Sequence, residues 1–406
     1  MCSYRPGRAS PSHIVKICDI TQFYSPLSGG VKRYVHEKIA YIDRYSPNDE
    51  HILIVPGPRT ELTANDRSRI YSVRSPVVSR ASQYRALLNL RKVGEILERE
   101  RPDIIESSDP YQLAWKAIAS GRALRIPAVG FYHSHFAEAY LRRPAGFMGR
   151  TATEAVMDFA ARYVRNVYNR FEATLVPSEN LAQVLGKWGV DNVRVVKLGV
   201  NTEIFKPGSA NTDGTRISLG VASDQQLLLY VGRLSPEKNT QLLFEAFDLI
   251  EKRRPGDFHF VLIGDGPQRD GVIKLQKQND AAVTWIPYCA DPAELARYYR
   301  AADLFVHPGV QEVFGLAALE SQACGTPVVG IRGSNLDRII FHDQESWAQK
   351  NTAEALADAI ESYIAKDLSK MGAQAARKAA ALYGWPRVFD ELFCIYREVC
   401  GNYSPS

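Results

Sequence analysis

Short apolar runs alternate with stretches of helical apolar spacing along both halves of the 406-residue chain. A run of this kind, bounded by turn residues, is typical of a strand buried on both faces, and the intervening helices are typical of those that cover a parallel sheet. In the first half, strands are predicted at residues 14–20, 51–56, 103–108, 128–134 and 173–178. In the second half, strands are predicted at residues 226–232, 258–264, 282–287, 303–308 and 326–331.

This alternation predicts the α/β fold class, with two doubly wound, Rossmann-like domains that face each other. Their boundary is expected within residues 198–215, where Gly, Pro, Asn and Thr cluster and the helical spacing lapses. We therefore predict a first domain over residues 1–205, a second over residues 206–380, and a separate helical segment over residues 381–406.

The charge of the chain is distributed unevenly. Residues 1–205 carry 29 Lys and Arg against 20 Asp and Glu, whereas residues 206–406 carry 21 against 25. The basic first half suits an anionic partner, such as a lipid surface or a phosphorylated acceptor. Cations scattered over a solvated surface would produce the same excess, so the asymmetry alone does not choose between the two explanations.

The cysteines and the apolar segments bear on where the protein works. The six cysteines form no Cys-x-x-Cys pair and have no zinc-type spacing, which is typical of a reducing compartment. No stretch approaches the roughly 18 uninterrupted apolar residues of a membrane span, and no signal-type apolar core follows the charged start. We expect a cytoplasmic protein that has the option of contact with the inner face of a membrane.

A glycine pair and a pair of cations follow predicted strands. Gly29 and Gly30 stand between the first strand and a helical stretch, where free backbone N–H groups can approach a phosphate. Arg233 and Lys238 follow the strand at 226–232, where they could neutralise a diphosphate at the sheet edge that binds ligands. A plain tight turn and solvated surface cations are the alternative explanations.

The stretch HPGVQEVFGLAALESQACGTPVV, residues 307–329, is the most informative. A helix that begins near Gly315 would offer the free N–H groups of Gly315 and Leu316 to a phosphate. Glu312 would then lie before this helix and Glu320 about two turns later. Ordinary capping by glutamate near a helix start is the alternative explanation.

Two histidines end the strand at 128–134. His133 and His135 share one face of an extended chain, so both imidazoles could point to the ligand edge of the sheet. We expect one of them to do polar work there; ordinary hydrogen-bonded histidines are the alternative. Because the sequence has no Asp-x-Asp pair and no zinc-type spacing, we expect no metal, and Arg233, Lys238 and two helix starts would stabilise a leaving diphosphate.

Seven motifs occur in one order along nearly the whole chain: SGGVKRY, FYHSH, VPSE, LGVNTEIFKP, YVGRLSPEKN, IGDGP and EVFGLAALESQACGTPVV. In this order they resemble the retaining GT-B nucleotide-sugar glycosyltransferases of family four. The resemblance implies two facing Rossmann-like domains, with a C-terminal helix that crosses back to the first domain. It also implies a nucleotide sugar as a substrate and no cofactor or metal.

The resemblance further implies a role for each matching residue. Gly29 and Gly30 match the loop over the donor phosphates, Arg233 and Lys238 the diphosphate-binding pair, and His133 the histidine beside the anomeric centre. Glu312 matches the glutamate that contacts the transferred sugar, and Glu320 the one that binds the ribose. Backbone contacts to sugar, phosphate and base match the following residues: Phe314, Gly315, Leu316, Tyr288 and Cys289.

The chain departs from the family pattern at Pro287, where a glycine is usual, and at residues 332–340, which replace a double glycine. These departures leave the base of the donor open between GDP-mannose and a UDP-hexose such as UDP-glucose. FYSPLSGGVKRY and FYHSHFAEAYLRR are similar to members that act on lipid-type acceptors. Residues 138–170 carry six Arg against three acidic residues, which suits a basic surface for anionic lipid; a helix packed on its own domain with solvated Arg is the alternative.

The sequence therefore predicts a retaining hexosyltransferase, with mannose or glucose as the sugar and a glycan or a lipid as the acceptor. No nucleic-acid partner is expected, and peripheral contact with an anionic membrane would occur through the first domain. Two alternatives remain: an inactive GT-B binding protein, and a NAD-dependent oxidoreductase, against which the missing Gly-x-Gly-x-x-Gly fingerprint argues.

Overall fold

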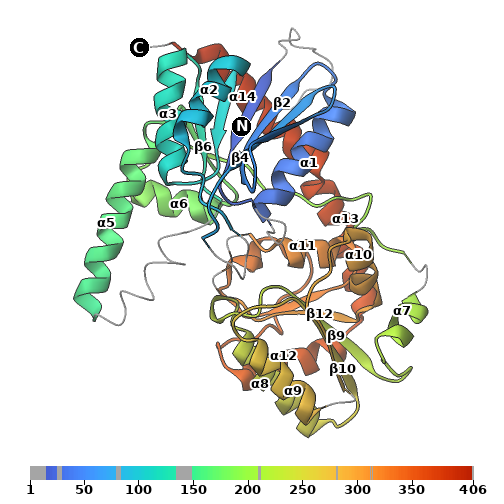
Figure 1. Cartoon of the computed structure of the whole chain (residues 1–406). Helices are drawn as coiled ribbons and strands as arrows, with labels where there is room; N and C mark the ends of the chain where they lie inside the picture. The colour runs from blue at the N-terminus through green and yellow to red at the C-terminus, as the bar shows by residue number, and fades with distance from the viewer. Residues whose placement is uncertain are drawn as a thin grey trace. The chain divides into compact units, whose positions relative to one another are not determined.

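The computed structural model describes residues 15–24, 30–78, 84–133, 149–208, 212–279, 282–310, 312 and 314–404. The chain divides into two compact units. The N-terminal unit comprises residues 1–197 and 386–406, and the C-terminal unit comprises residues 198–385 (Figure 1).

The N-terminal unit is a sheet of order β3-β4-β2-β1-β5-β6-β7-β8, parallel except for the antiparallel β3–β4 pair. Its strands are β1 (Lys16–Ile20), β2 (Glu50–Gly57), β3 (Glu61–Ala64), β4 (Ser68–Arg74), β5 (Ile104–Ser107), β6 (Ala128–Phe131), β7 (Ala173–Val176) and β8 (Val193–Val195). Its helices are α1 (Gly30–Tyr45), α2 (Leu90–Glu100), α3 (Gln112–Leu124), α5 (Arg150–Tyr168), α6 (Glu179–Lys187) and α14 (Trp385–Asn402).

The C-terminal unit is an all-parallel sheet of order β11-β10-β9-β12-β13. Its strands are β9 (Gln226–Val231), β10 (Phe258–Ile263), β11 (Val283–Ile286), β12 (Leu304–His307) and β13 (Val328–Gly330). Its helices are α7 (Thr212–Ser218), α8 (Thr240–Arg253), α9 (Arg269–Gln278), α10 (Pro292–Ala301), α11 (Leu316–Ala323), α12 (Ala353–Ile364) and α13 (Leu368–Tyr383), with 3-10 turns at Pro236–Lys238 and Asn335–Arg338.

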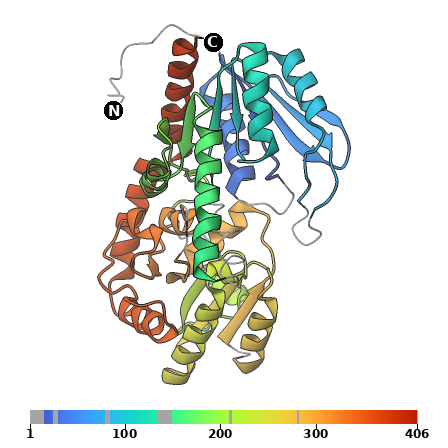
Figure 2. The same ribbon diagram turned by 90° about the vertical axis from the view of Figure 1, so that its left-hand side faces the viewer.

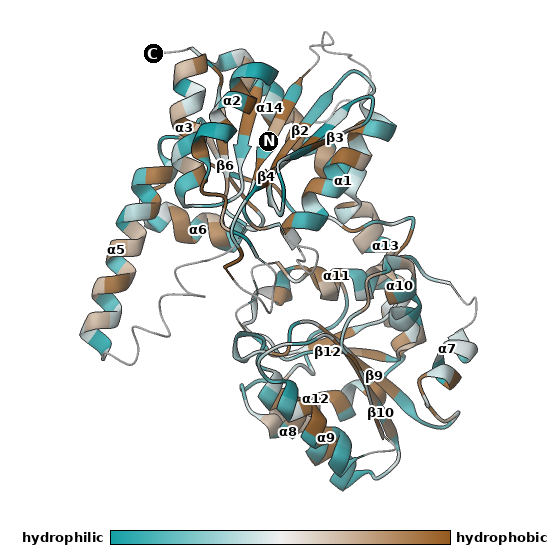
Figure 3. Ribbon diagram, viewed as in Figure 1, coloured by the Kyte–Doolittle hydropathy of each residue, from teal (hydrophilic) through white to brown (hydrophobic). Residues whose placement is uncertain are grey.

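Each unit is a doubly wound layer structure, with helices on both faces of its sheet (Figures 1 and 2). Apolar residues concentrate in the central strands, and polar residues cover the outward faces of many helices (Figure 3). Every residue of β10 is buried, which explains why its sequence is apolar except at His259 and does not alternate. The α/β fold class predicted from the sequence is confirmed.

The ten predicted strands all occur, but the expectation of about five strands in the first half is wrong, because its sheet has eight. β3, β4 and β8 were not predicted, since all four residues of β3 are exposed, β8 is exposed or half-buried along its length, and β4 mixes buried with half-buried and exposed residues. Such outer strands lack the apolar run of a strand that is covered on both faces.

The last helix completes the N-terminal unit. Tyr41 of α1 donates a hydrogen bond to Asp390 of α14 at 2.5 Å, and Arg397 of α14 forms an ion pair with Asp49 at 2.9 Å. The predicted helix that crosses back to the first domain is therefore confirmed. Just before α14 begins, the Tyr383 carbonyl accepts a hydrogen bond from the Val200 N–H at 2.7 Å, and both residues belong to the C-terminal unit.

Candidate active site

The loop after β9 carries the two predicted cations, and it is held against the loop after β10. Leu234 donates its N–H to the Asp265 carbonyl at 3.1 Å, and a Cβ on Gly264 would lie 1.9 Å from the Gly232 carbonyl oxygen. Gly264 also has a φ of +139°, so a side chain there would be strained as well as crowded. Both loops leave the carboxyl ends of their strands, the edge at which open α/β sheets bind ligands.

Lys238 and Glu312 meet at this edge. The Lys238 ammonium forms a very short ion pair with Glu312, although the two residues are 74 positions apart in the sequence. His307, the last residue of β12, places its Nε2 atom 3.5 Å from the same carboxylate. The turn that holds His307 is also fixed, because Gly309 donates its N–H to His307 Nδ1 at 3.2 Å.

The electrostatics of this pair keep Glu312 ionised. Burial raises the pKa of its carboxyl group, but the ammonium of Lys238 and the hydrogen bond with His307 outweigh burial and hold the pKa well below its usual range. A fixed cation and a fixed anion therefore lie side by side. Such a pair can bind a phosphate through one member and sugar hydroxyls through the other.

The helix predicted to begin near Gly315 is α11, and Gly315 is its N-terminal cap. Gly315 has a φ of +85°, and a Cβ there would lie 2.1 Å from Leu336 Cδ2, so this position requires glycine. Among the residues that the structure describes, no side chain caps the helix, and its first turn holds no acidic residue. The N–H groups that begin at Leu316 therefore face an uncapped helix start, which suits an anion.

The remaining predicted donor-site residues of the C-terminal unit have different environments. Arg233 is exposed and lies 3.9 Å from Glu237. Glu320 is buried and accepts a hydrogen bond from Tyr299 at 3.3 Å. Phe314 is buried against Tyr383, with 5.9 Å between the ring centroids.

Tyr288 and Cys289 follow β11. Tyr288 is exposed, whereas Cys289 is half-buried and directs its thiol to Asp291 and Glu294. Burial, together with Glu294, raises the pKa of the Cys289 thiol to about 11, so the thiol is neutral near pH 7. Cys289 therefore contributes neither charge nor a reactive thiolate at this edge of the sheet.

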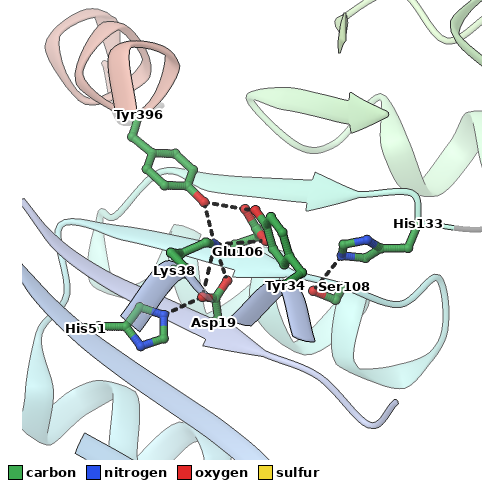
Figure 4. Close-up of polar contacts among 8 residues, drawn as sticks. All are labelled: Asp19, Tyr34, Lys38, His51, Glu106, Ser108, His133 and Tyr396. Atoms are coloured by element: carbon green, nitrogen blue, oxygen red, sulfur yellow. Dashed lines mark hydrogen bonds and ion pairs between the residues drawn. The ribbon is translucent and has the colours of Figure 1, made fainter. Parts of the chain in front are cut away.

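His133 lies just beyond β6 in the N-terminal unit (Figure 4). Its ring stacks on Phe131 at 3.9 Å and 2°, meets Tyr34 edge-on at 5.1 Å, and places Nε2 3.3 Å from Ser108 Oγ. Burial, assisted by the nearby Lys38 cation, lowers the pKa of His133 to about 3. The imidazole is therefore neutral near pH 7 and can hydrogen-bond without adding positive charge.

A buried charged cluster lies behind His133, and sequence reasoning missed it. Lys38 of α1 donates to Asp19 at 2.9 and 3.0 Å, to Glu106 at 3.3 Å and to the Tyr396 hydroxyl at 2.8 Å (Figure 4). His51 forms a very short contact with the Asp19 carboxylate. Asp19, Lys38 and Glu106 are completely buried. We refer to Asp19, Lys38, His51, Glu106 and Tyr396 as the buried cluster.

The two carboxylates of the buried cluster differ in their protonation. Burial and the charge on Asp19 raise the pKa of Glu106 to about 7, even though Lys38 opposes this. For Asp19, Lys38 and His51 outweigh burial and hold the pKa well below the usual range. Near neutral pH, one carboxylate is thus firmly ionised and the other is close to its titration point.

We predict that Glu106→Gln changes how stability depends on pH. Because the pKa of Glu106 is raised in the folded state, its stabilising effect is complete below the unfolded pKa and is lost as the pH rises through about 7. Between pH 5 and pH 8, the free energy of unfolding of the wild type relative to Glu106→Gln should fall by about 1–3 kcal/mol. Urea denaturation at both pH values measures this difference; parallel pH profiles of the two proteins would contradict the prediction.

The structure brings some of the predicted site residues into contact, and others lie outside the described residues. Within the C-terminal unit, it joins Lys238 and Glu312 directly and places the α11 start on the same sheet edge. Gly30 is the first residue of α1, whereas Gly29 and His135 lie outside the described residues. His307 was not predicted, although a histidine at the end of a predicted strand was a visible signal.

Neither a metal-binding cluster nor a membrane-spanning helix occurs within the described ranges of the chain. Within those ranges, no group of three or more His, Cys, Asp and Glu side chains has a geometry that could hold a metal ion. In the same ranges, none of the helices combines the length and the apolar character needed to cross a bilayer.

Comparison with known protein families identifies the class of protein. Residues 28–204 match the family described as Glycosyltransferase Family 4, and residues 212–380 match the family described as Glycosyl transferases group 1. The chain therefore belongs to glycosyltransferase family 4, and it is a transferase with the GT-B fold. Nothing in these comparisons favours an oxidoreductase.

Individual relatives agree with this assignment. The chain is 30% identical over 379 residues to a GDP-mannose-dependent alpha-(1-6)-phosphatidylinositol dimannoside mannosyltransferase of Mycobacterium tuberculosis. The matched region spans 92% of this chain and 93% of the relative. It is 27% identical over 332 residues to a GDP-mannose-dependent alpha-mannosyltransferase of Corynebacterium glutamicum, covering 80% of this chain and 74% of the relative.

Among solved structures, sucrose-phosphate synthase from Thermosynechococcus elongatus superposes with a TM-score of 0.73 at 21% identity, covering 95% of this chain and 99% of the other. At this identity, the likeness supports the fold and nothing finer.

Proposed function

We propose that this protein is a retaining hexosyltransferase that works without a metal ion and uses a nucleoside-diphosphate sugar. The pairing of Lys238 with Glu312, next to the uncapped start of α11, carries this proposal. Lys238, Arg233 and the N–H groups that begin at Leu316 would stabilise the negative charge of the departing diphosphate. Because Lys238 and the N–H groups of α11 are held in place before the donor arrives, little reorganisation of them is needed in the transition state.

The acid–base chemistry follows from the protonation states. The bond from the anomeric carbon to the diphosphate oxygen breaks, and an acceptor hydroxyl forms the new bond on the same face. The leaving phosphate takes the hydroxyl proton, so no general base of the protein is required. The ionised Glu312 would hold hydroxyls of the transferred sugar, and the neutral His133 would hydrogen-bond near the developing positive charge without repelling it.

The remaining donor contacts are proposed to follow the family pattern. Gly29 and Gly30 would cover the phosphates, Glu320 would bind the ribose, and the backbone at Tyr288 and Cys289 would contact the base. The backbone of Phe314 and Gly315 would hold the sugar and the phosphate.

We further propose mannose as the sugar and GDP as its carrier, because the two relatives described above have names that specify GDP-mannose. The acceptor is proposed to be a hydroxyl of a lipid headgroup or of a glycan. One relative is named for a phosphatidylinositol dimannoside, which has both characters. A protein with such an acceptor would work at the inner face of a membrane.

Nucleotide binding tests the donor proposal directly. GDP-mannose should raise the melting temperature more than UDP-glucose or ADP-glucose do, because a ligand that binds only the folded state stabilises it by mass action. At a concentration of about 100 times Kd, the gain is roughly 2.7 kcal/mol, or about 5–10 °C for a unit of this size. Differential scanning fluorimetry in EDTA measures it; no shift with any nucleotide sugar would overturn the proposal.

The reaction needs its own readout. Transfer from GDP-mannose to a lipid or glycan acceptor should proceed in EDTA and give a product with the donor's anomeric configuration, measured by proton NMR. Binding without transfer or hydrolysis would favour the inactive binding protein. Loss of transfer in EDTA, restored by a divalent cation, would overturn metal independence.

A further inference from the structure

Asn239, the residue after Lys238, has an unusual backbone conformation. Its φ is +59° and its ψ is 32°, in the left-handed region that non-glycine residues rarely adopt. Across the described ranges of the chain, the other non-glycine residues with a positive φ are Arg101 and Arg125. Both are C-caps of α-helices, α2 and α3, where a left-handed residue is ordinary. Asn239 instead joins the 3-10 turn Pro236–Lys238 to the start of α8.

The side chain of Asn239 does not have the contact that is usual for its place. Asn239 is the N-cap of α8, and an N-cap asparagine ordinarily accepts a hydrogen bond from an N–H group of the first helical turn. In the part of the chain that the structure describes, this side chain makes no capping bond to its helix. Stabilisation of α8 therefore does not explain an asparagine at this position.

The side-chain amide of Asn239 instead joins three segments of the C-terminal unit. Its Nδ2 atom donates to the Pro308 carbonyl at 3.0 Å and to Asn351 Oδ1 at 2.8 Å. β9 and β12 are adjacent parallel strands, so the loop after β9 and Pro308, which follows β12, leave the same edge of the sheet. Asn351 comes from the segment between β13 and α12. One amide therefore connects three chain segments at or next to the proposed site.

These contacts hold the backbone that carries Lys238. On one side, Lys238 donates its N–H to the Ser235 carbonyl at 3.0 Å. On the other side, Asn239 bonds the residue that follows His307, and His307 Nε2 lies 3.5 Å from the Glu312 carboxylate. Lys238 thus belongs to the loop that carries the amide, whereas its ion-pair partner follows the strand end that the amide binds.

We propose that Asn239 is a positioning residue for sugar transfer, whose amide sets Lys238 against Glu312 by holding the loop after β9 to the end of β12. The amide acts through Lys238 and needs no contact with the reacting atoms. A cation stabilises a departing diphosphate best when it is already in place, so a small displacement of Lys238 should slow the reaction. This effect on transfer rests on the proposed function; the positioning of Lys238 beside Glu312 does not.

Two substitutions separate the amide from the backbone conformation. Glycine adopts the left-handed region without strain, so Asn239→Gly keeps the turn and removes both side-chain hydrogen bonds. Asn239→Ala also removes the amide, but it adds strain because the alanine Cβ disfavours a positive φ. If the amide is responsible, the two variants should lose the same activity, while Asn239→Ala should unfold at a lower urea concentration.

Steady-state kinetics with GDP-mannose tests the effect on transfer. Asn239→Gly is expected to lower kcat by about tenfold and to change KM by less than about threefold. In the Lys238→Ala background, the same substitution should not lower kcat further, because the cation that it positions is absent. An unchanged kcat in Asn239→Gly, or a tenfold drop in both backgrounds, would overturn the inference.

The matched control is Asn169→Ala in the N-terminal unit. Asn169 Nδ2 also donates to a backbone carbonyl, that of Gly189 at 2.8 Å, but Asn169 contacts none of the proposed site residues. This variant should keep the kcat of the wild type. Its retained activity would show that loss of an asparagine hydrogen bond does not by itself slow transfer.

A second measurement needs no sugar transfer. Lys238→Ala removes the ion pair with Glu312, and the resulting shift of the urea midpoint should be at least about halved in the Asn239→Gly background. Equal shifts in the two backgrounds, zero included, would overturn the positioning. Absence of transfer by the wild type would overturn the proposed function alone, whereas transfer together with equal shifts would overturn the positioning alone.

Discussion

Replacing Lys238 by alanine is expected to lower the turnover number by about 10²–10³. Lys238 is the cation that the C-terminal unit fixes beside Glu312, and the departing diphosphate would lose it at the moment its negative charge develops. Steady-state kinetics with GDP-mannose measures the effect. The loss should fall on kcat more than on KM, because the charge to be stabilised is largest in the transition state.

This substitution also leaves Glu312 without its ammonium partner. Lys238 and His307 hold the pKa of Glu312 low against burial, so with His307 still in place the ionised carboxylate would lack its offsetting ammonium and would repel a phosphate. The double variant Lys238→Ala/Glu312→Gln separates the two effects, since it lacks both charges and should regain donor binding without regaining turnover. Lys252→Ala, which removes an exposed cation of α8, is the matched control. Unchanged turnover in Lys238→Ala would remove Lys238 from the site.

Replacing Lys38 by methionine is expected to lower the free energy of unfolding by about 3–5 kcal/mol. Methionine fills most of the space of the lysine stem, but Asp19 and Glu106 would remain in a fully buried environment without their common cation. Urea denaturation, followed by circular dichroism, measures the loss. The α6 variant Lys187→Met, which changes an exposed lysine, should leave stability within about 0.5 kcal/mol of the wild type.

The charge origin of this loss can be checked separately. Lys38→Met/Asp19→Asn/Glu106→Gln removes the two anions along with the cation, so it should recover a large part of the lost stability. A triple variant as unstable as Lys38→Met alone would show that packing around the lysine stem, and not unpaired charge, accounts for the effect.

The sequence was most informative for covered strands and glycine-dependent turns. Strand β10 is buried along its whole length, so its apolar residues, interrupted only by His259, gave a clear signal. Gly315 marked the start of α11, where its backbone angle and its contact with Leu336 both require glycine. Strand β3 gave no such signal. All of its residues are exposed, and its pairing with β4 depends on backbone hydrogen bonds that any sequence can make.

Among the polar sites too, some residues could be predicted from the sequence and their contacts could not. Arg233, Lys238, Glu312 and Glu320 could be selected because each stands near a strand end or a helix start in a family motif. The direct pairing of Lys238 with Glu312 could not be read from positions 74 apart. Lys38 was harder still, because a lysine within an amphipathic helix ordinarily faces water, and its partners come from two separate strands and a helix more than 350 residues later.

The return of α14 to the N-terminal unit has a consequence for biosynthesis. Lys38, Tyr41 and Asp49 are made early, yet their partners Tyr396, Asp390 and Arg397 leave the ribosome after the whole C-terminal unit. During translation, the first-made half must therefore wait in an unfinished state, with Lys38 lacking one of its hydrogen-bond partners, while the second-made half can close its own sheet. The nascent chain would acquire its last tertiary contacts in the region it synthesised first.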